Sequence, residues 1–134
     1  MIVIYTAVSC VASRRAISWF KRNRISYIER KISNKNPLTK KELKDILVLT
    51  DNGWEDILCF RSNCYKKIKK EFEGYTFEKA VDVAIRNPTL VRNPIITNGK
   101  IIKIGFNEDV LRSFIPKKCR KKKLMQYYSS TIND

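Results

Sequence analysis

The sequence of 134 residues contains no histidine and no Cys-x-x-Cys motif. Structural zinc sites are built from closely spaced cysteines and histidines. The cysteines of this chain are instead irregularly spaced, at Cys10, Cys59, Cys64 and Cys119. The sequence therefore argues against a bound metal, and we expect no cofactor.

Long apolar runs are also missing, and none approaches the roughly 20 residues that a membrane-spanning helix needs. The segment 1–5 has no basic region, and its apolar run is too short for a secretory signal. We therefore expect a cytoplasmic protein that does not contact a membrane. Its cysteines should be mostly reduced in that compartment.

Acidic residues are scarce: 13 Asp and Glu oppose 28 Lys and Arg, giving a formal net charge of +15. Such a charge bears on partners rather than on fold. It suits nucleic acid, an acidic protein surface or an anionic small molecule, although a surface that serves only solubility is the alternative. The length is that of one domain, and 43% hydrophobic content allows a real core.

The N-terminal pattern predicts a strand–helix–strand unit with a cysteine at the start of the helix. Apolar, partly β-branched residues at 2–6 indicate a buried strand, and a second strand is predicted at 26–30. A helix opens at Ser9-Cys10 between them. The side chains that share its apolar face are Ala12, Ala16, Trp19 and Phe20.

Cys10 is a candidate nucleophile or redox centre. A cysteine in the first helical turn meets free backbone N–H groups and the positive end of the helix dipole, which stabilise a thiolate. Arg14 and Arg15, one turn further on, can add to this effect. The alternative is an inert small apolar side chain.

Several helices are predicted in the middle of the chain. Thr39 and Glu42 have the spacing of a capping box, and Gly53 is expected to end the helix that follows. Further helices are predicted near 62–72 and after Thr76. The apolar face of the latter is predicted to hold Phe77, Ala80, Val81 and Ala84.

The C-terminal part begins with a hairpin, since Asn98-Gly99 is a strong turn signal between apolar runs. Asn107 then caps a last helix. Its inward side is predicted to hold Val110, Leu111 and Phe114. The residues from Lys117 to Lys123 are basic except for Cys119, and the tail has no clear amphipathic pattern.

This order predicts an α/β fold with a thioredoxin-like core built on a mixed four-stranded sheet. Residues 1–32 and 89–116 would form the core. Residues 33–88 would form a helical insertion between the second and third strands. Residues 117–134 would form a basic tail.

Short motifs in a fixed order extend along nearly the whole chain. They are Ile4-Tyr5-Thr6 with Ser9-Cys10 and Arg14, Pro37-Leu38-Thr39 with Glu42-Leu43 and Ile46-Leu47, Arg61-Ser62, Asn87-Pro88, Leu90 through Ile96, and Ile104 through Asp109 with Arg112, Phe114, Ile115, Pro116 and Lys117. Together they resemble the Spx/arsenate-reductase (ArsC-like) family. The last block is the most specific part of the resemblance.

The resemblance implies an ArsC-like fold and a regulator that binds the C-terminal domain of the RNA polymerase α subunit under stress. Promoter DNA within the polymerase complex and an ATP-dependent protease are implied as further partners. We expect a monomeric protein. We also expect a regulator rather than an enzyme. The alternatives are a thiol-dependent reductase that uses Cys10, and an adaptor for some other acidic protein.

The sequence departs from these regulators at the position of the second switch cysteine, which here is Ser13. A disulfide between positions 10 and 13 is therefore chemically excluded. Cys10 would act as a single thiol, pair with one of the remote cysteines, or have no redox role.

The loop before the third strand is a second departure. Pro94 matches the family's usually cis proline, but the residue before it is Asn93 where the family usually has arginine. Arg92 is one position earlier, and neighbours on an extended segment point in opposite directions. Arg61 matches a second arginine of the family. Simple surface solvation is the alternative for Arg61 and Arg92.

Gly53 matches a glycine on which α-subunit binding depends in the regulators, and Trp54 beside it is either core or an interface anchor. Basic clusters offer contacts to promoter phosphates, without sequence specificity. The candidate residues are Lys66, Lys67, Lys69, Lys70, Lys117, Lys118 and Arg120. No helix-turn-helix or ribbon motif for reading bases is present in the sequence.

Overall fold

The computed structural model describes residues 1–115, and its centre is a mixed four-stranded sheet with the order β2-β1-β3-β4. The strands are β1 Val3–Ala7, β2 Ile28–Ile32, β3 Ile95–Thr97 and β4 Ile102–Ile104. β1 runs parallel to β2 and antiparallel to β3, which pairs antiparallel with β4. The predicted α/β class and mixed four-stranded sheet are confirmed.

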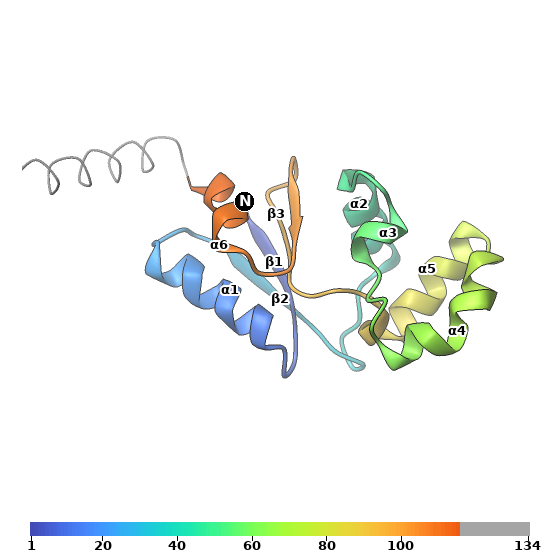
Figure 1. The fold of residues 1–134 in the computed structure, drawn as a ribbon. Helices are drawn as coiled ribbons and strands as arrows, with labels where there is room; N and C mark the ends of the chain where they lie inside the picture. The colour runs from blue at the N-terminus through green and yellow to red at the C-terminus, as the bar shows by residue number, and fades with distance from the viewer. Residues whose placement is uncertain (116–134) are drawn as a thin grey trace, which may run out of the picture.

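Helices cover both faces of this sheet, so the molecule has three layers (Figure 1). α1 (Val11–Arg22), α6 (Glu108–Leu111) and the 3₁₀ turn η2 (Arg112–Phe114) lie on one side. The helices on the other side come between β2 and β3 in the chain. They are α2 Lys40–Leu49, α3 Trp54–Ile57, α4 Asn63–Glu73 and α5 Phe77–Arg86, followed by the 3₁₀ turn η1 Pro88–Leu90.

Alternation along β1 gives the fold two separate hydrophobic cores, because successive strand side chains point to opposite faces. Ile4 packs with Phe20, Ile96 and Leu111 on the α1 side. Tyr5 packs with residues of α2 and α5 on the other side. The sheet is therefore apolar on both faces and holds the two helical layers in place.

Two residues of the predicted apolar faces are exposed instead. Phe77 is 50% exposed because it begins α5 at the edge of the core, where its ring contacts Trp54. Val110 is 39% exposed because α6 is a single turn that continues as η2. Leu111, Phe114 and Ile115 make the inward contacts of that segment.

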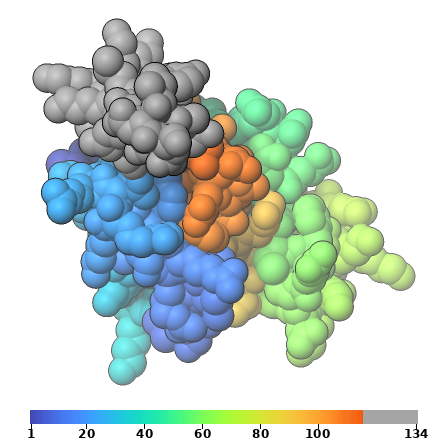
Figure 2. All heavy atoms as spheres, turned by 60° about the vertical axis from the view of Figure 1, so that its left-hand side comes forward, coloured from blue at the N-terminus to red at the C-terminus, as the bar shows by residue number. Residues whose placement is uncertain are grey.

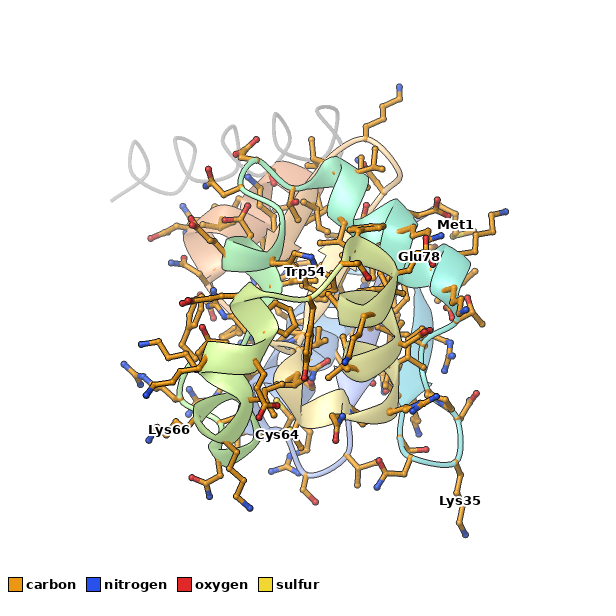
Figure 3. The ribbon with its side chains drawn as sticks, turned by 90° about the vertical axis from the view of Figure 1, so that its right-hand side faces the viewer. Met1, Lys35, Trp54, Cys64, Lys66 and Glu78 are labelled. Carbon is orange, nitrogen blue, oxygen red and sulfur yellow. The ribbon has the colours of Figure 1, made fainter. Side chains whose placement is uncertain are left out.

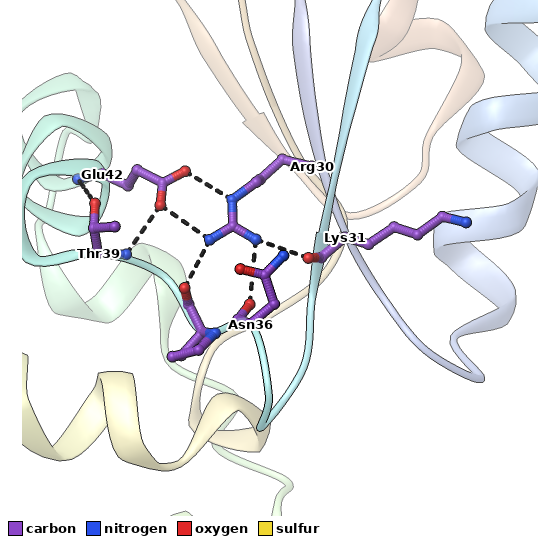
Figure 4. Close-up of polar contacts among 6 residues, drawn as sticks. Arg30, Lys31, Asn36, Thr39 and Glu42 are labelled. Atoms are coloured by element: carbon purple, nitrogen blue, oxygen red, sulfur yellow. Dashed lines mark hydrogen bonds and ion pairs between the residues drawn. The ribbon is translucent and has the colours of Figure 1, made fainter.

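Arg30 joins the sheet to the helical layer (Figure 4). Its Nε and Nη2 donate to the two carboxylate oxygens of Glu42, at 3.0 and 3.2 Å. The remaining guanidinium bonds reach backbone carbonyl oxygens of Lys31, Asn36 and Pro37. One side chain on β2 therefore fixes both the loop after β2 and the first turn of α2.

The capping box of α2 is part of the same network. The Thr39 hydroxyl accepts from the Glu42 N–H at 3.1 Å, and Glu42 Oε1 accepts from the Thr39 N–H at 2.9 Å. Burial acts to raise the pKa of Glu42, but the Arg30 and Thr39 contacts outweigh burial and lower it. The ionised Glu42 thus stabilises the fold at neutral pH.

Replacing Arg30 with methionine should lower the free energy of unfolding by about 2 kcal/mol, because Glu42 loses its partner in a partly buried site. Urea denaturation at pH 7 measures this change. Lys44→Met is the matched control, because it breaks the more exposed Lys44–Glu78 pair and should cost at most about 0.5 kcal/mol.

The pH dependence gives the same experiment a second readout. The contribution of Glu42 is present above its ordinary pKa of about 4.5 and is lost as the pH falls through its lowered folded pKa. The parent should therefore lose more stability on acidification than Arg30→Met. Equal losses for the Arg30 and Lys44 variants at pH 7 would contradict this role for Arg30.

Candidate functional site

Cys10 lies at the turn where β1 leads into α1. Ser9 takes a positive φ of 61°, which turns the chain so that Cys10 becomes the N-cap of α1. The thiol is half-buried, and its Sγ is 3.9 Å from the backbone carbonyl oxygen of Asn93. The Cys10 side chain caps no N–H group, so the first turn of α1 keeps its free donors beside the thiol.

Ser13 stands where the regulators have the second cysteine of their switch, and it makes a structural contact there. It is only 2% exposed, and its hydroxyl oxygen accepts from the backbone N–H of Ala7 at 3.3 Å. Ala12, predicted on the buried face of this helix, is only partly buried, so Ser13 takes its place beside β1. A polar side chain is favoured at position 13 because it satisfies a backbone donor.

The loop opposite the cysteine contains a cis peptide bond between Asn93 and Pro94. Asn93 Nδ2 donates to the carbonyl oxygen of Val91 at 3.1 Å. Its Oδ1 is buried and has no hydrogen-bond partner within residues 1–115. Asn93 therefore presents a carbonyl acceptor near the thiol and supplies no positive charge to it.

Arg92 lies near Asp51, Glu55 and Asp56 and makes no contact with Cys10. Its Nη2 lies 3.6 Å from the position that a Cβ atom would occupy at Gly105. The positive charge of Arg92 contributes to lowering the pKa of Asp56. Arg92 lines a polar hollow of about 460 Å³ together with Asp51, Glu55 and Asp56. Arg92 thus belongs with the loop around Gly53.

Other arginines lie along and beyond the cysteine helix. Arg14 and Arg15 are exposed and line an open hollow on α1 with Val11 and Phe106, where the α1 and α6 segments adjoin (Figure 2). Arg61 is exposed in the turn before α4. No hydrogen bond or ion pair within the described part of the chain joins an arginine to Cys10 or Asn93.

Gly53 begins a helix, whereas the sequence predicted that it ends one. α2 ends earlier, at Leu49, with Thr50 as its C-cap, and Gly53 is the N-cap of α3. Its φ of 62° suits glycine, and a Cβ added there would meet nothing within 4 Å. The prediction of a C-cap glycine is therefore wrong, because a short loop separates Gly53 from α2.

Asp56 holds this loop, and the sequence analysis missed it. Its carboxylate accepts from the backbone N–H groups of Asp51 and Asn52 at 3.1 and 3.0 Å, and from Asn52 Nδ2 at 3.3 Å. The Asn52 N–H is the main cause of a lowered pKa of Asp56. The sequence signal that could have identified Asp56 is its position three residues after the N-cap glycine, where a carboxylate can accept from exposed backbone N–H groups.

Trp54 is positioned by aromatic contacts at the end of this loop. Its ring packs edge-on against Phe72 at a centroid distance of 5.5 Å, and it contacts the Phe77 ring in a tilted arrangement at 6.3 Å. The side chain is partly buried at the margin of the core and points between α4 and α5 (Figure 3). These contacts hold Trp54 in one place while part of its surface stays accessible.

The predicted basic cluster lies on α4, which has no buried residue. Lys66, Lys67, Lys69 and Lys70 are all exposed, and Lys66 projects from the outer side of the helix (Figure 3). The Ser62 hydroxyl caps the helix by accepting from the Tyr65 N–H at 3.1 Å. Lys117, Lys118, Arg120 and Cys119, with the rest of the predicted tail, lie outside the described residues.

Two classes of feature are missing from residues 1–115. No group of three or more histidine, cysteine or acidic side chains is placed to hold a metal ion. In the same range, every helix is too short or too polar to cross a membrane.

Comparison with known proteins gives consistent matches. The family model described as the ArsC family matches residues 5–114. The global transcriptional regulator Spx of Streptococcus pneumoniae is 36% identical over 126 residues, covering 94% of each chain. Spx 1 of Lactococcus lactis, also described as a global transcriptional regulator, is 35% identical over 93% of this chain and 97% of its own.

Solved structures share the fold at lower identity. An ArsC-family-related protein from Bacteroides fragilis has a TM-score of 0.71 at 23% identity, over 84% of this chain and 96% of that one. An arsenate reductase from Vibrio cholerae has a TM-score of 0.67 at 18% identity, over 85% of this chain and 97% of its own. At these identities the likeness shows a common fold.

Proposed function

The chain belongs to the ArsC family and, within it, to the Spx group, and on this premise we propose that it is a transcriptional regulator acting on RNA polymerase. The observation that carries the proposal is similarity over nearly the full length to regulators of transcription. The binding target we propose is the C-terminal domain of the polymerase α subunit. The proposed role is in a stress response.

The Gly53 loop is the proposed contact surface for that domain. Open space above Gly53 allows a partner's backbone to approach closely, and the Asp56 hydrogen bonds keep the loop in one conformation. Trp54 beside it is a partly exposed aromatic side chain that is already ordered. Ordering before binding lowers the entropic cost of forming the complex.

Gly53→Arg should weaken binding to isolated α C-terminal domain at least tenfold, because a long charged side chain would occupy the contact surface. Isothermal titration calorimetry measures the Kd. Gly99→Arg is the matched control: Gly99 also has a positive φ and open space, but it lies in the β3–β4 turn.

The two glycine variants add the same charge and a comparable backbone strain, so only location distinguishes them. Gly99→Arg should bind like the parent. Equal weakening by both variants would argue against the Gly53 surface. No complex with the parent at tens of micromolar, a weak affinity for a regulator, would contradict the proposed function itself.

The α4 lysines are proposed to contact promoter phosphates when the protein is bound to polymerase. Their exposure on one helix supports non-specific electrostatic contacts. Lys66→Gln with Lys70→Gln should weaken the polymerase–promoter–protein complex and make its affinity less dependent on salt. Competition experiments at several salt concentrations measure the slope, and an unchanged slope excludes these contacts.

A thiol-dependent reductase is the second candidate, favoured by Cys10 at the N-terminus of α1. The regulator is preferred because Asn93 and the distant Arg92 leave the thiol without the fixed charge that an oxyanion substrate needs. Assays for arsenate and mixed-disulfide reduction, coupled to glutathione or thioredoxin, distinguish the two. We expect no turnover; turnover that Cys10→Ala abolishes would establish the enzyme.

A further inference from the structure

A hollow lies along α1 where the α1 and α6 segments adjoin (Figure 2). It has a volume of about 440 Å³, in the range of sites that bind small molecules. Its polar lining consists of Arg14, Arg15, Ser18, Arg22 and Glu108. Among the described residues, neither Cys10 nor Asn93 lines this hollow, so it is separate from the surroundings of the thiol.

Arg14 and Arg15 have guanidinium groups that are free to bind a ligand. Both side chains are exposed, and neither guanidinium group forms an ion pair or a hydrogen bond within residues 1–115. Glu29 lines a neighbouring hollow with Arg14, but its carboxylate accepts from the Thr6 hydroxyl at 2.8 Å. Because Arg14 and Arg15 line the same hollow, two forked cations can donate to one anion there.

The charge of the hollow is positive. Glu108 supplies the carboxylate of the described lining, and Arg22 offsets it in an ion pair at 3.5 Å. Three arginines therefore face one carboxylate, a net charge of +2. The first turn of α1, which begins at Val11, adds the positive end of its helix dipole. A phosphate group, with about two negative charges at pH 7, matches this charge better than a carboxylate with one.

The same hollow has an apolar part. Val11 is 53% exposed and lines it. Phe106, which precedes α6, also lines it and is held by packing against the core on the α1 side. An exposed valine and an anchored aromatic ring offer a surface to an apolar or aromatic group. A ligand that fills the hollow therefore combines an anionic head with an apolar body.

We propose that this hollow binds a small organic monophosphate, with the phosphate group on Arg14 and Arg15 and the apolar body against Val11 and Phe106. Charge-assisted hydrogen bonds hold the phosphate group. The apolar contact distinguishes an organic phosphate from the inorganic ion. The hollow and the Gly53 loop lie on opposite sides of the sheet, so the site does not depend on the proposed function (Figure 1).

Titration of the full chain with phenyl phosphate, followed by amide NMR shifts, tests the proposal. Saturable shifts should centre on residues 11–18 and 106–108, with a Kd below about 5 mM. Inorganic phosphate carries only the head and benzyl alcohol only the body, so each should bind at least about fivefold more weakly. Non-saturating shifts up to that concentration, or inorganic phosphate binding as tightly as phenyl phosphate, would overturn the proposal.

Two charge-matched double variants locate the site. Arg14→Gln with Arg15→Gln should weaken the binding of phenyl phosphate at least about tenfold. Lys41→Gln with Arg86→Gln removes the same charge from exposed positions on α2 and α5, and it should bind within about twofold of the parent. Equal weakening by both double variants would show that net charge alone attracts the ligand, and would contradict the site.

A single variant tests the apolar part of the hollow. Val11→Glu places a negative charge against the phosphate group and should abolish saturable binding. The variant should fold normally, because position 11 is exposed and an acidic residue in the first turn stabilises a helix. Unchanged affinity in Val11→Glu would sink the proposed site.

Discussion

The bidentate contact between Arg30 and Glu42 determines how the helical layer sits on the sheet. Arg30 pairs in register with Tyr5 in the centre of β1, and its guanidinium also binds the carbonyl oxygens of the loop after β2. Glu42 is in the first turn of α2, and α2 leads directly to the loop that holds Gly53. The position of that loop relative to the sheet thus depends on a planar, forked cation that lysine cannot replace.

The fold separates two surfaces that differ in what they can do. On the cysteine side, Ser13 satisfies the Ala7 N–H, and Asn93 presents its backbone carbonyl oxygen to the thiol and no positive charge. The thiol therefore lacks both a disulfide partner at position 13 and a directly bound arginine. On the Gly53 side, Asp56 and Arg92 line a charged hollow, and the nearby Gly53 has free space above it. Protein-binding chemistry is concentrated on the second surface, which favours a binding protein over a catalyst.

Features set by short-range contacts could be predicted from the sequence. The capping box at Thr39 and Glu42, the hairpin at Asn98-Gly99 and the helical spacing of Ala16, Trp19 and Phe20 each depend on residues within a few positions. The role of Gly53 was missed because the exact end of α2, at Leu49, is not marked by the glycine. The surroundings of Arg92 could not be predicted because they depend on long-range packing of the segment before β3 against the end of α3, where the Arg92 N–H donates to the Ile57 carbonyl oxygen at 2.7 Å. The bounds of β2 were shifted for the same reason, since its register depends on pairing with β1.

We propose that this family member works as a binding protein through the Gly53 surface. Mapping the complex by amide NMR tests it most directly, with isotope-labelled protein and unlabelled α C-terminal domain. Shift changes should centre on Gly53 and Trp54 and extend to Arg92, leaving Cys10 and Ser13 unaffected. Changes centred on Cys10 and Asn93, or no change at saturating concentrations of the domain, would contradict the account.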